Sequence, residues 1–253
     1  MARWMAVAGA VAMALAVPAI AEPADVAAAV ANTAARTEAN VKLDDGRKPT
    51  EVLQFFGLEK GMHVLDMFGA NKYWAEITAP AVGPTGSITV WNRTQFLNDK
   101  NRAAFAEFAG KHSNVLLLAS PMEDPKLGTN AYDFAMMNLD YHDVYWESSQ
   151  FKISRMEPDA WLKALYAAVK PGATVAIIDH VANPGGNTRE VADKLHRIDP
   201  AIVRADFERA GFVFEAESDI LRNPADDHSL LVFDPKIRGK TDRVMYRFRK
   251  PAA

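Results

Sequence analysis

The chain has 253 residues, of which 49% are hydrophobic and 24% charged, and its formal net charge is −3. This balance is typical of a folded globular protein and excludes a disordered or collagen-like chain, while a negative charge without a Lys/Arg cluster argues against a nucleic-acid partner. The chain has no cysteine, so disulfides, thiolate metal sites and cysteine nucleophiles are excluded, and any metal must bind His, Asp, Glu, Asn or backbone oxygen.

The first 21 residues have the features of a secretory signal peptide. Arg3 gives a positive start, residues 4–17 are apolar and uncharged, and residues 19–21 form an A-x-A cleavage site. The apolar run is shorter than the roughly 20 residues that a membrane span needs. We therefore expect a cleaved leader and a periplasmic mature protein that begins near Glu22 and has no membrane span.

The next segment, residues 22–48, is predicted to be an N-terminal helical extension of a domain that covers residues 49–253. The Ala-rich stretch Ala24–Ala39 suits a single helix, and the charged stretch Asp44–Pro49 indicates a break before the next one.

Strands and helices alternate over most of the domain. Short apolar runs bounded by turn residues predict buried parallel strands at His63–Met67, Ser87–Trp91, Asn114–Leu118, Tyr132–Met137 and Thr174–Ile178. Helical patterns cover Thr50–Phe56, Tyr73–Ala81, Asn101–Lys111, Asp159–Val169 and Pro200–Ala210, the last with Asp199 as N-cap.

The C-terminal end departs from this alternation. Phe212–Ile220 and Arg243–Arg249 both alternate in strand fashion with no helix between them, which predicts an antiparallel pair. The insert of roughly 20 residues between them is long enough to suspect a function. Together the elements predict an α/β fold with a doubly wound, mostly parallel seven-stranded sheet of Rossmann-like type and an antiparallel C-terminal strand pair.

In a doubly wound sheet the ligand crevice forms outside the carboxyl ends of the strands. The polar residues at those ends follow four of the predicted strands, in the stretches Asp66–Lys72, Asn92–Arg93, Asn138–Asp143 and Asp179–His180. We therefore expect a small molecule to bind there.

Several of these stretches resemble a known family. The strand that ends in Asp66, with Gly83-Pro84 and Gly86 before the second strand, resembles the start of a class I S-adenosylmethionine-dependent methyltransferase. Further matches are His142-Asp143, Lys170-Pro171-Gly172, Asp179-His180, His196 to Pro200, Arg222 to His228 and Gly239 to Arg243. The whole, from about Asn40 to Pro251, resembles a bacterial family of exported predicted methyltransferases. This resemblance implies the class I methyltransferase fold, S-adenosylmethionine as cofactor and an unknown small-molecule acceptor.

The resemblance also implies which residues bind the cofactor. They are Asp66, Phe68, Gly69, Asn71, Asn92 and Asn138. The turn after the first strand departs from the family pattern, because it is glycine-rich there and reads Gly69-Ala70-Asn71-Lys72 here. We expect Lys72 to place a cation near the methionine half of the cofactor. The alternative for Asp66 is a carboxylate that caps the turn.

Pairs of histidine and aspartate indicate where the chemistry takes place. The candidate catalytic residues are His142, Asp143, Asp179 and His180, because both pairs follow neighbouring strands. His142 would be a general base with a pKa near its ordinary value of about 6.5, oriented by Asp143 or Asp179. We assign no metal ligand, although a divalent metal at Asp140, Asp179 and His180 is an alternative.

Two functions remain open at this point. The first is a periplasmic methyltransferase that acts on a small molecule, with no protein partner predicted. The second is a non-catalytic protein of the same fold that binds another small molecule or a metal, which the altered glycine turn favours. Tyr141, Tyr145 and Trp146 are candidates for an aromatic substrate pocket or for the core, and His196 for a catalytic or a structural role.

Overall fold

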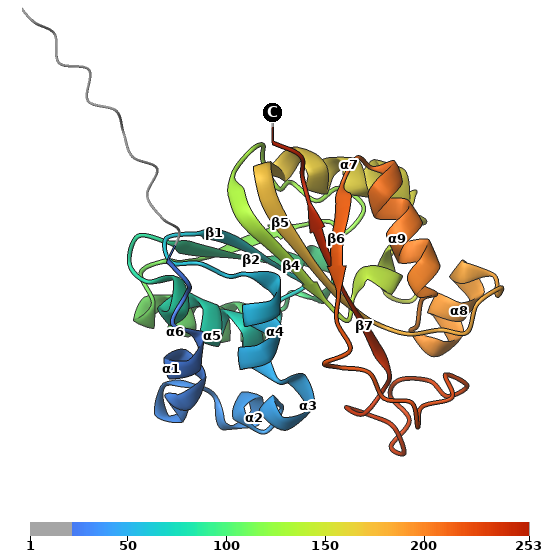
Figure 1. The fold of residues 1–253 in the computed structure, drawn as a ribbon, viewed down its shortest axis with the longest axis horizontal. Coiled ribbons are helices and arrows are strands. Elements are labelled where there is room, and N and C mark those ends of the chain that lie inside the picture. The colour runs from blue at the N-terminus through green and yellow to red at the C-terminus, as the bar shows by residue number, and fades with distance from the viewer. Residues whose placement is uncertain (1–21, 253) are drawn as a thin grey trace, which may run out of the picture.

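The computed structural model describes residues 22–252, so the expected signal peptide, residues 1–21, lies outside the described part of the chain. A seven-stranded sheet forms the centre of the molecule, with strand order β3-β2-β1-β4-β5-β7-β6 (Figure 1). The strands are β1 (His63–Met67), β2 (Ser87–Arg93), β3 (Val115–Ser120), β4 (Tyr132–Asn138), β5 (Val169–His180), β6 (Val213–Glu217) and β7 (Arg243–Arg249). The first five are parallel, and β7 runs antiparallel to both β5 and β6, which confirms the predicted fold class.

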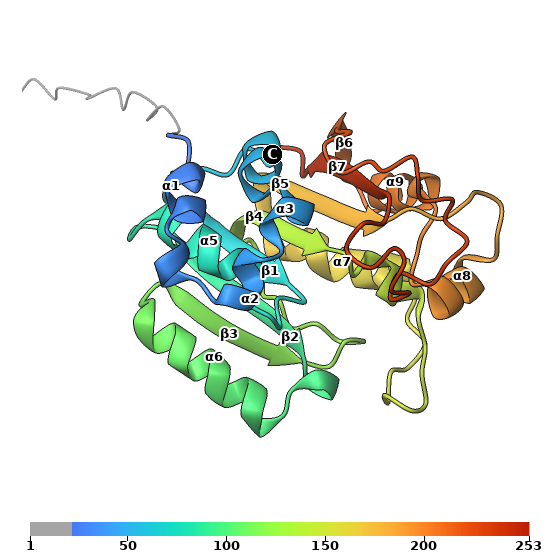
Figure 2. The same cartoon turned by 90° about the horizontal axis from the view of Figure 1, so that it is seen from below.

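Helices cover both faces of the sheet, as Figure 2 shows from below. The α-helices are α1 (Val26–Ala31), α2 (Glu38–Val41), α3 (Asp44–Arg47), α4 (Pro49–Phe56), α5 (Tyr73–Val82), α6 (Asp99–Lys111), α7 (Pro158–Ala168), α8 (Thr188–Leu195) and α9 (Pro200–Arg209). Three short 3-10 helices are η1 (Thr33–Ala35), η2 (Thr94–Phe96) and η3 (Tyr141–Tyr145). Within the described residues, none of the helices has the length and apolar character to cross a membrane.

The strands are apolar on both faces because helices pack on both. In β1, Leu65 and Met67 join the core under α7 and α9, whereas Val64 points to the opposite core under α1, α4, α5 and α6. Successive side chains of a strand point to opposite faces, so a strand buried on both faces reads as a continuous apolar run. For this reason the sequence located β1 to the residue, while β7 was located to the residue from its alternating pattern. The predicted N-cap of α9 is also confirmed, because the Asp199 carboxylate accepts a hydrogen bond from the Ala201 amide at 2.8 Å.

The expectation of one helix over Ala24–Ala39 is wrong. The stretch forms α1, η1 and α2 instead, with Asn32 ending α1. The break arises because polar side chains after Asn32 bond to other parts of the protein. Arg36 pairs with Asp44, and Thr37 donates from its amide to the buried Glu76 carboxylate at 3.1 Å. These tertiary bonds outweigh the helix propensity of alanine.

Two further segments differ from the predictions. The expected break at Asp44–Pro49 contains the short helix α3, and α8 was not predicted at all. Asn187 begins α8 by accepting hydrogen bonds from the amides of Arg189 and Glu190. This helix places His196, which follows its last residue, beside the ends of the strands.

Candidate functional site

Two cavities lie side by side at the carboxyl ends of the strands, where the crevice was predicted. The first has a volume of about 300 Å³ and is lined by residues from α3, the β1–α5 turn and the ends of β2 and β4. The second, about 390 Å³, is lined by residues from η2, η3, the end of β5, α8 and the insert before β7. Arg93, Leu139 and Asp140 line both cavities, so the two spaces are neighbours across a shared wall.

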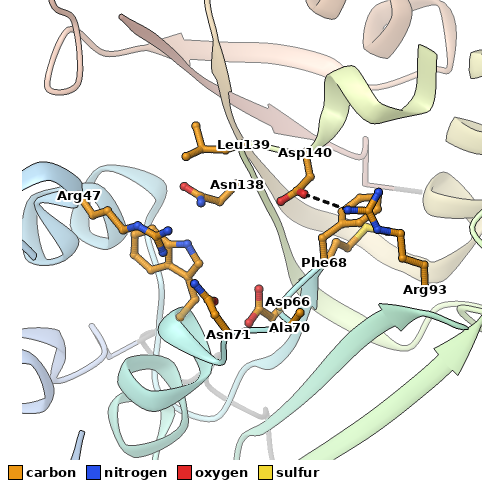
Figure 3. Close-up of a pocket in the computed structure, with 12 residues that line it drawn as sticks. Arg47, Asp66, Phe68, Ala70, Asn71, Arg93, Asn138, Leu139 and Asp140 are labelled. Atoms are coloured by element: carbon orange, nitrogen blue, oxygen red, sulfur yellow. Dashed lines mark ion pairs between the residues drawn. The ribbon is translucent and has the colours of Figure 1, made fainter. Parts of the chain in front are cut away.

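Asp66 lines the first cavity at the end of β1 (Figure 3). Its side chain is buried, and its Oδ2 atom has no hydrogen-bond partner among the described residues. Burial raises the pKa of Asp66 to about 7, against the opposing charge of Arg47. Because a buried polar atom is almost always satisfied, this oxygen is a strong candidate to accept a hydrogen bond from a ligand.

The turn after β1 keeps the backbone shape of a glycine-rich turn without most of its glycines. Phe68 and Lys72 take the left-handed conformation, with φ of 58° and 61°. The Phe68 ring packs against Trp91, at 4.8 Å between ring centroids. At the retained Gly69 a Cβ atom would lie 2.5 Å from Asp66 Oδ2, so only glycine fits there.

The Lys72 side chain does not lie near the expected cofactor site. It lines a separate hollow on the outer side of α5, together with Arg36, Glu76 and Lys111, and it is not among the residues that line the first cavity. The reason is its left-handed backbone at the N-cap of α5, which directs the side chain away from the crevice.

The cation in the first cavity that sequence reasoning missed is Arg47. It enters from α3 on the side opposite Arg93 and Asp140, as Figure 3 shows. Its guanidinium lies 4.2 Å from the centre of the Tyr73 ring. Burial lowers the pKa of Arg47, and the nearby Tyr73, Asp140 and Asp66 oppose this effect. The stretch was noticed only as a charged break, because its position over the β1 turn depends on tertiary packing.

The predicted cofactor-binding residues are divided by the structure. Asp66, Phe68, Gly69, Asn71 and Asn138 all line the first cavity. Asn92 is buried at the end of β2 and is not among the lining residues. Its neighbour Arg93 lines the cavity instead.

Arg93 and Asp140 form the wall between the two cavities. Arg93 Nη2 lies 3.6 Å from Asp140 Oδ1, and Arg93 Nη1 donates to Asp143 Oδ2 at 2.7 Å. The guanidinium also lies 4.8 Å from the centre of the Phe68 ring and 4.4 Å from that of Phe96. The removal of water raises the pKa of Asp140 to about 8, against the attraction of Arg93.

Most of the second cavity is apolar. Its aromatic and aliphatic lining residues are Phe96, Leu139, Trp146, Phe151, Val232 and Phe233. Of the three aromatic candidates from the sequence, Trp146 lines this cavity, whereas Tyr141 is a core residue whose hydroxyl donates to Asp206 at 2.8 Å. Tyr145 also donates to Asp206. The insert before β7 contributes Val232 and Phe233.

A polar group at one end of the second cavity contains His142, Asp143 and His196, which we call the histidine cluster. His142 Nδ1 lies 2.8 Å from Asp179 Oδ1, and the His142 amide donates to Asp179 Oδ2 at 2.8 Å. On the other side of the ring, His142 Nε2 lies 3.2 Å from His196 Nδ1. The structure therefore brings the predicted His142, Asp143 and Asp179 together and adds His196.

The charges around His142 change its protonation from the expected value. Burial lowers the pKa of His142, but the carboxylates of Asp179 and Asp143 outweigh this effect and raise it to about 9, so the expectation of an ordinary value is wrong. Burial would raise the pKa of Asp143, yet His142 and its other partners hold it well below the usual range. Burial and the charge of His142 keep the pKa of His180 well below 6.5, and His180 Nδ1 lies 2.6 Å from the Thr241 hydroxyl.

The alternative metal site at Asp140, Asp179 and His180 is not assembled. Both Asp179 oxygens accept hydrogen bonds, from His142 and from the His180 amide at 2.7 Å. His180 Nδ1 is occupied by Thr241. Asp179 therefore orients His142 and His180 and has no free oxygen directed at a common point with Asp140.

No protein-family model matches this sequence, and neither does any curated protein. Solved structures do match. A SAM-dependent methyltransferase from Aquifex aeolicus shares 22% identity over 84% of this chain and 94% of its own, with a TM-score of 0.57. The 4+2 cyclase SpnF shares 16% over 82% of this chain and 81% of its own, with a TM-score of 0.56.

A third similar structure is an arsenic(III) S-adenosylmethionine methyltransferase from Chlamydomonas reinhardtii. It shares 16% identity over 92% of this chain and 75% of its own, with a TM-score of 0.53. These likenesses establish the fold of the class I SAM-dependent methyltransferases for this chain. Because one similar structure is named for a cyclisation, the fold alone does not decide the reaction.

Proposed function

We propose that this chain is an S-adenosylmethionine-dependent methyltransferase that binds the cofactor in the first cavity and a small acceptor in the second. The observation that carries the proposal is the pair of neighbouring cavities at the carboxyl ends of the strands, with the unpaired Asp66 oxygen in the first and the histidine cluster in the second. The periplasmic location expected from residues 1–21 is part of this proposal.

The residues of the first cavity fit an amino-acid group of the cofactor. Asp66 Oδ2 is a buried acceptor that needs a donor, which an ammonium or hydroxyl group provides. Arg47 offers a fork of donors for a carboxylate. The Phe68 ring packs against Trp91. The altered turn still places Gly69 beside the cavity. When bound, the cofactor supplies a methyl group on a sulfonium centre.

The second cavity selects an acceptor with a flat apolar body and one polar end. Trp146, Phe151 and Phe233 suit an aromatic or fused-ring compound. The polar end would face His142 and Asp143, and we propose that neutral His142 removes the proton of its nucleophilic atom. The raised pKa of His142, about 9, then confines this step to alkaline pH. Asp179 acts on them as a positioning residue, because it holds the His142 ring from behind. Methyl transfer needs little beyond in-line positioning and the removal of one proton.

The test is a calorimetric titration of the mature chain, residues 22–253, with S-adenosylmethionine and then with its demethylated product. We expect micromolar binding of both. Arg47→Met should weaken it about tenfold to a hundredfold, because a charge-assisted hydrogen bond contributes about 1.5–3 kcal/mol. The control is Arg102→Met on the outer surface of α6, which should bind as tightly as the original chain.

Absence of heat with both compounds would refute the proposal. The non-catalytic alternative would then stand, and other ligands of the second cavity would be sought by thermal shift. Equal affinity in the Arg47→Met and Arg102→Met proteins would instead refute the assigned role of Arg47.

A further inference from the structure

Three ligand-type atoms of the histidine cluster face one another. His142 Nε2 lies 3.2 Å from His196 Nδ1 and 3.3 Å from Asp143 Oδ1, and His196 Nδ1 lies 3.5 Å from the same oxygen. The three atoms therefore form a nearly equilateral triangle. All three residues line the second cavity.

The size of this triangle can be compared with the ligand separations in metal sites. Nitrogen and oxygen ligands lie about 2.0–2.2 Å from Zn²⁺, so two corners of such a tetrahedron are about 3.3–3.6 Å apart. An octahedron with the bonds of Mg²⁺, about 2.0–2.1 Å, brings neighbouring ligands to about 3.0 Å. The observed separations agree with the face of a tetrahedron.

Among the described residues, the hydrogen bonds around the cluster leave these three atoms facing one another, with a contact between His142 Nε2 and His196 Nδ1. Asp179 Oδ1 accepts from His142 Nδ1, so Nε2 is the ring nitrogen that can bind a metal, with release of its proton. Arg93 occupies Asp143 Oδ2, while Asp143 Oδ1 is buried and has no hydrogen-bond partner among the described residues. A proton shared between the two imidazoles joins His142 Nε2 to His196 Nδ1 but leaves Asp143 Oδ1 without a partner. A cation at the centre of the triangle would bind all three atoms at once.

We propose that His142 Nε2, His196 Nδ1 and Asp143 Oδ1 bind a divalent cation of the Zn²⁺ type in tetrahedral geometry, with the fourth position open to the second cavity. Two imidazoles and one carboxylate are a borderline donor set, which suits Zn²⁺ better than Mg²⁺ or Ca²⁺. Asp179 completes the arrangement, because a carboxylate behind a metal-binding histidine fixes the ring and its tautomer.

The open position indicates a substrate class for the second cavity. A Zn²⁺-type ion lowers the pKa of a bound hydroxyl or thiol and holds the resulting anion. The acceptor would then be an aromatic or apolar compound with a hydroxyl or thiol at its polar end. This last step rests on the proposed function, whereas the metal site itself does not.

The first test measures metal binding without any cofactor. The purified mature chain is stripped with a chelator and titrated with Zn²⁺ against a chromogenic competitor, and in parallel with Co²⁺, whose visible absorption reports tetrahedral coordination. We expect one equivalent per chain and the strong bands of tetrahedral Co²⁺.

The variants are chosen so that the fold survives. His196 has a left-handed φ of 52° at the C-cap of α8, a position where glycine is favoured, so His196→Gly removes the ligand and keeps the helix end. We expect its metal affinity to fall at least a hundredfold. Asp179→Asn, which alters only the positioning residue, should lose about tenfold to a hundredfold. The matched control is His63→Ala, an exposed histidine far along β1 from the cluster, which should bind as the original chain does.

Two results would overturn the metal site: failure to bind one equivalent, or an affinity unchanged in His196→Gly. Octahedral rather than tetrahedral Co²⁺ spectra would overturn its geometry. Cofactor titrations are repeated on metal-free and metal-loaded protein, so that loss of the metal site and loss of cofactor binding are seen separately.

Discussion

The fold places Asp66, a predicted cofactor-binding residue, in the first cavity. It ends β1 because a parallel strand in this fold delivers its last side chains to the crevice. The turn that follows is so tight that Gly69 admits no Cβ beside the carboxylate. The result is a buried carboxyl group beside the turn that lines the first cavity. One of its oxygens has no hydrogen-bond partner among the described residues.

This burial makes the stability of the protein depend on pH. The pKa of Asp66 is about 7 in the folded protein and 3.8 in its ordinary state. Between these values the unfolded chain has released the proton and the folded chain has not, so folding loses stability as the pH rises through this window. Above it the loss is complete and amounts to about 4 kcal/mol, at about 1.4 kcal/mol per pKa unit.

Asp66→Asn removes this ionisation with little change in shape. We expect the variant to gain stability relative to the original chain as the pH rises from 4 to 7, by up to about 4 kcal/mol, and to show a constant difference above pH 8. Urea unfolding at a series of pH values measures the difference. A gap that does not vary with pH would mean that the Asp66 carboxyl ionises in the folded protein as it does in the unfolded one.

Residue-scale prediction indicated the residues that line the two cavities where they follow the strand ends, and was less informative where they come from elsewhere. Asp66, Asn138, His142 and Asp143 were found because they follow predicted strands. Arg47 lies in the short helix α3, and His196, for which a catalytic and a structural role were both open, follows the last residue of α8. The sequence does not indicate that these helices pack against the crevice. Lys72 was misplaced because its left-handed backbone directs the side chain outward.

At the scale of elements, a buried ion pair helps to hold the insert between β6 and β7. Arg197 is fully buried, and its guanidinium bonds to both oxygens of Asp226, at 2.9 and 3.0 Å. It also donates to the carbonyls of Val181 and Leu230. This pair joins the insert to the end of β5, and through it Phe233 reaches the second cavity.

Asp226→Ala leaves the Arg197 charge buried without its partner. Removal of one member of a buried pair costs about 3–5 kcal/mol, and we expect a loss of this size in urea unfolding. Limited proteolysis should also cut residues 218–242 faster. Asp227→Ala, which changes the adjacent exposed carboxylate, is the control and should change neither measurement. Equal behaviour of the two variants would show that the pair does not hold the insert.

The elements themselves differed in how well the sequence predicted them. Strands buried on both faces have a composition that few other structures share, and β1, β2 and β4 were located to within two residues. The edge strands β3 and β6 are only partly buried, and β5 begins at Val169, five residues before its predicted start. The N-terminal segment was predicted as one helix because alanine favours helices. Its real course follows from bonds to Asp44 and Glu76, which local sequence does not contain.

At the scale of the whole molecule, residues 22–48 belong to the same body as the sheet. Val26 and Ala29 are buried in the core under α4 and α5. Asn40 Nδ2 donates to the carbonyl of Asn71 at 3.0 Å, in the turn that lines the first cavity. Arg243 donates to the carbonyl of Gly46 at 2.6 Å, which joins α3 to β7. The segment thus contacts both the β1–α5 turn and β7.

Removal of residues 22–48 from the mature chain should therefore damage the fold and the site together. The buried Glu76 would lose its bonds from Thr37, the apolar faces of α4 and α5 would meet water, and Arg47 would be lost. Burial of one aliphatic side chain contributes about 1.5–3 kcal/mol, and 1 kcal/mol changes Tm by about 2–4 °C in a protein of this size. We expect Tm to fall by about 10 °C or more, measured by differential scanning calorimetry. A shortened chain that unfolds within a few degrees of the mature one would show that the segment is an independent addition to the domain.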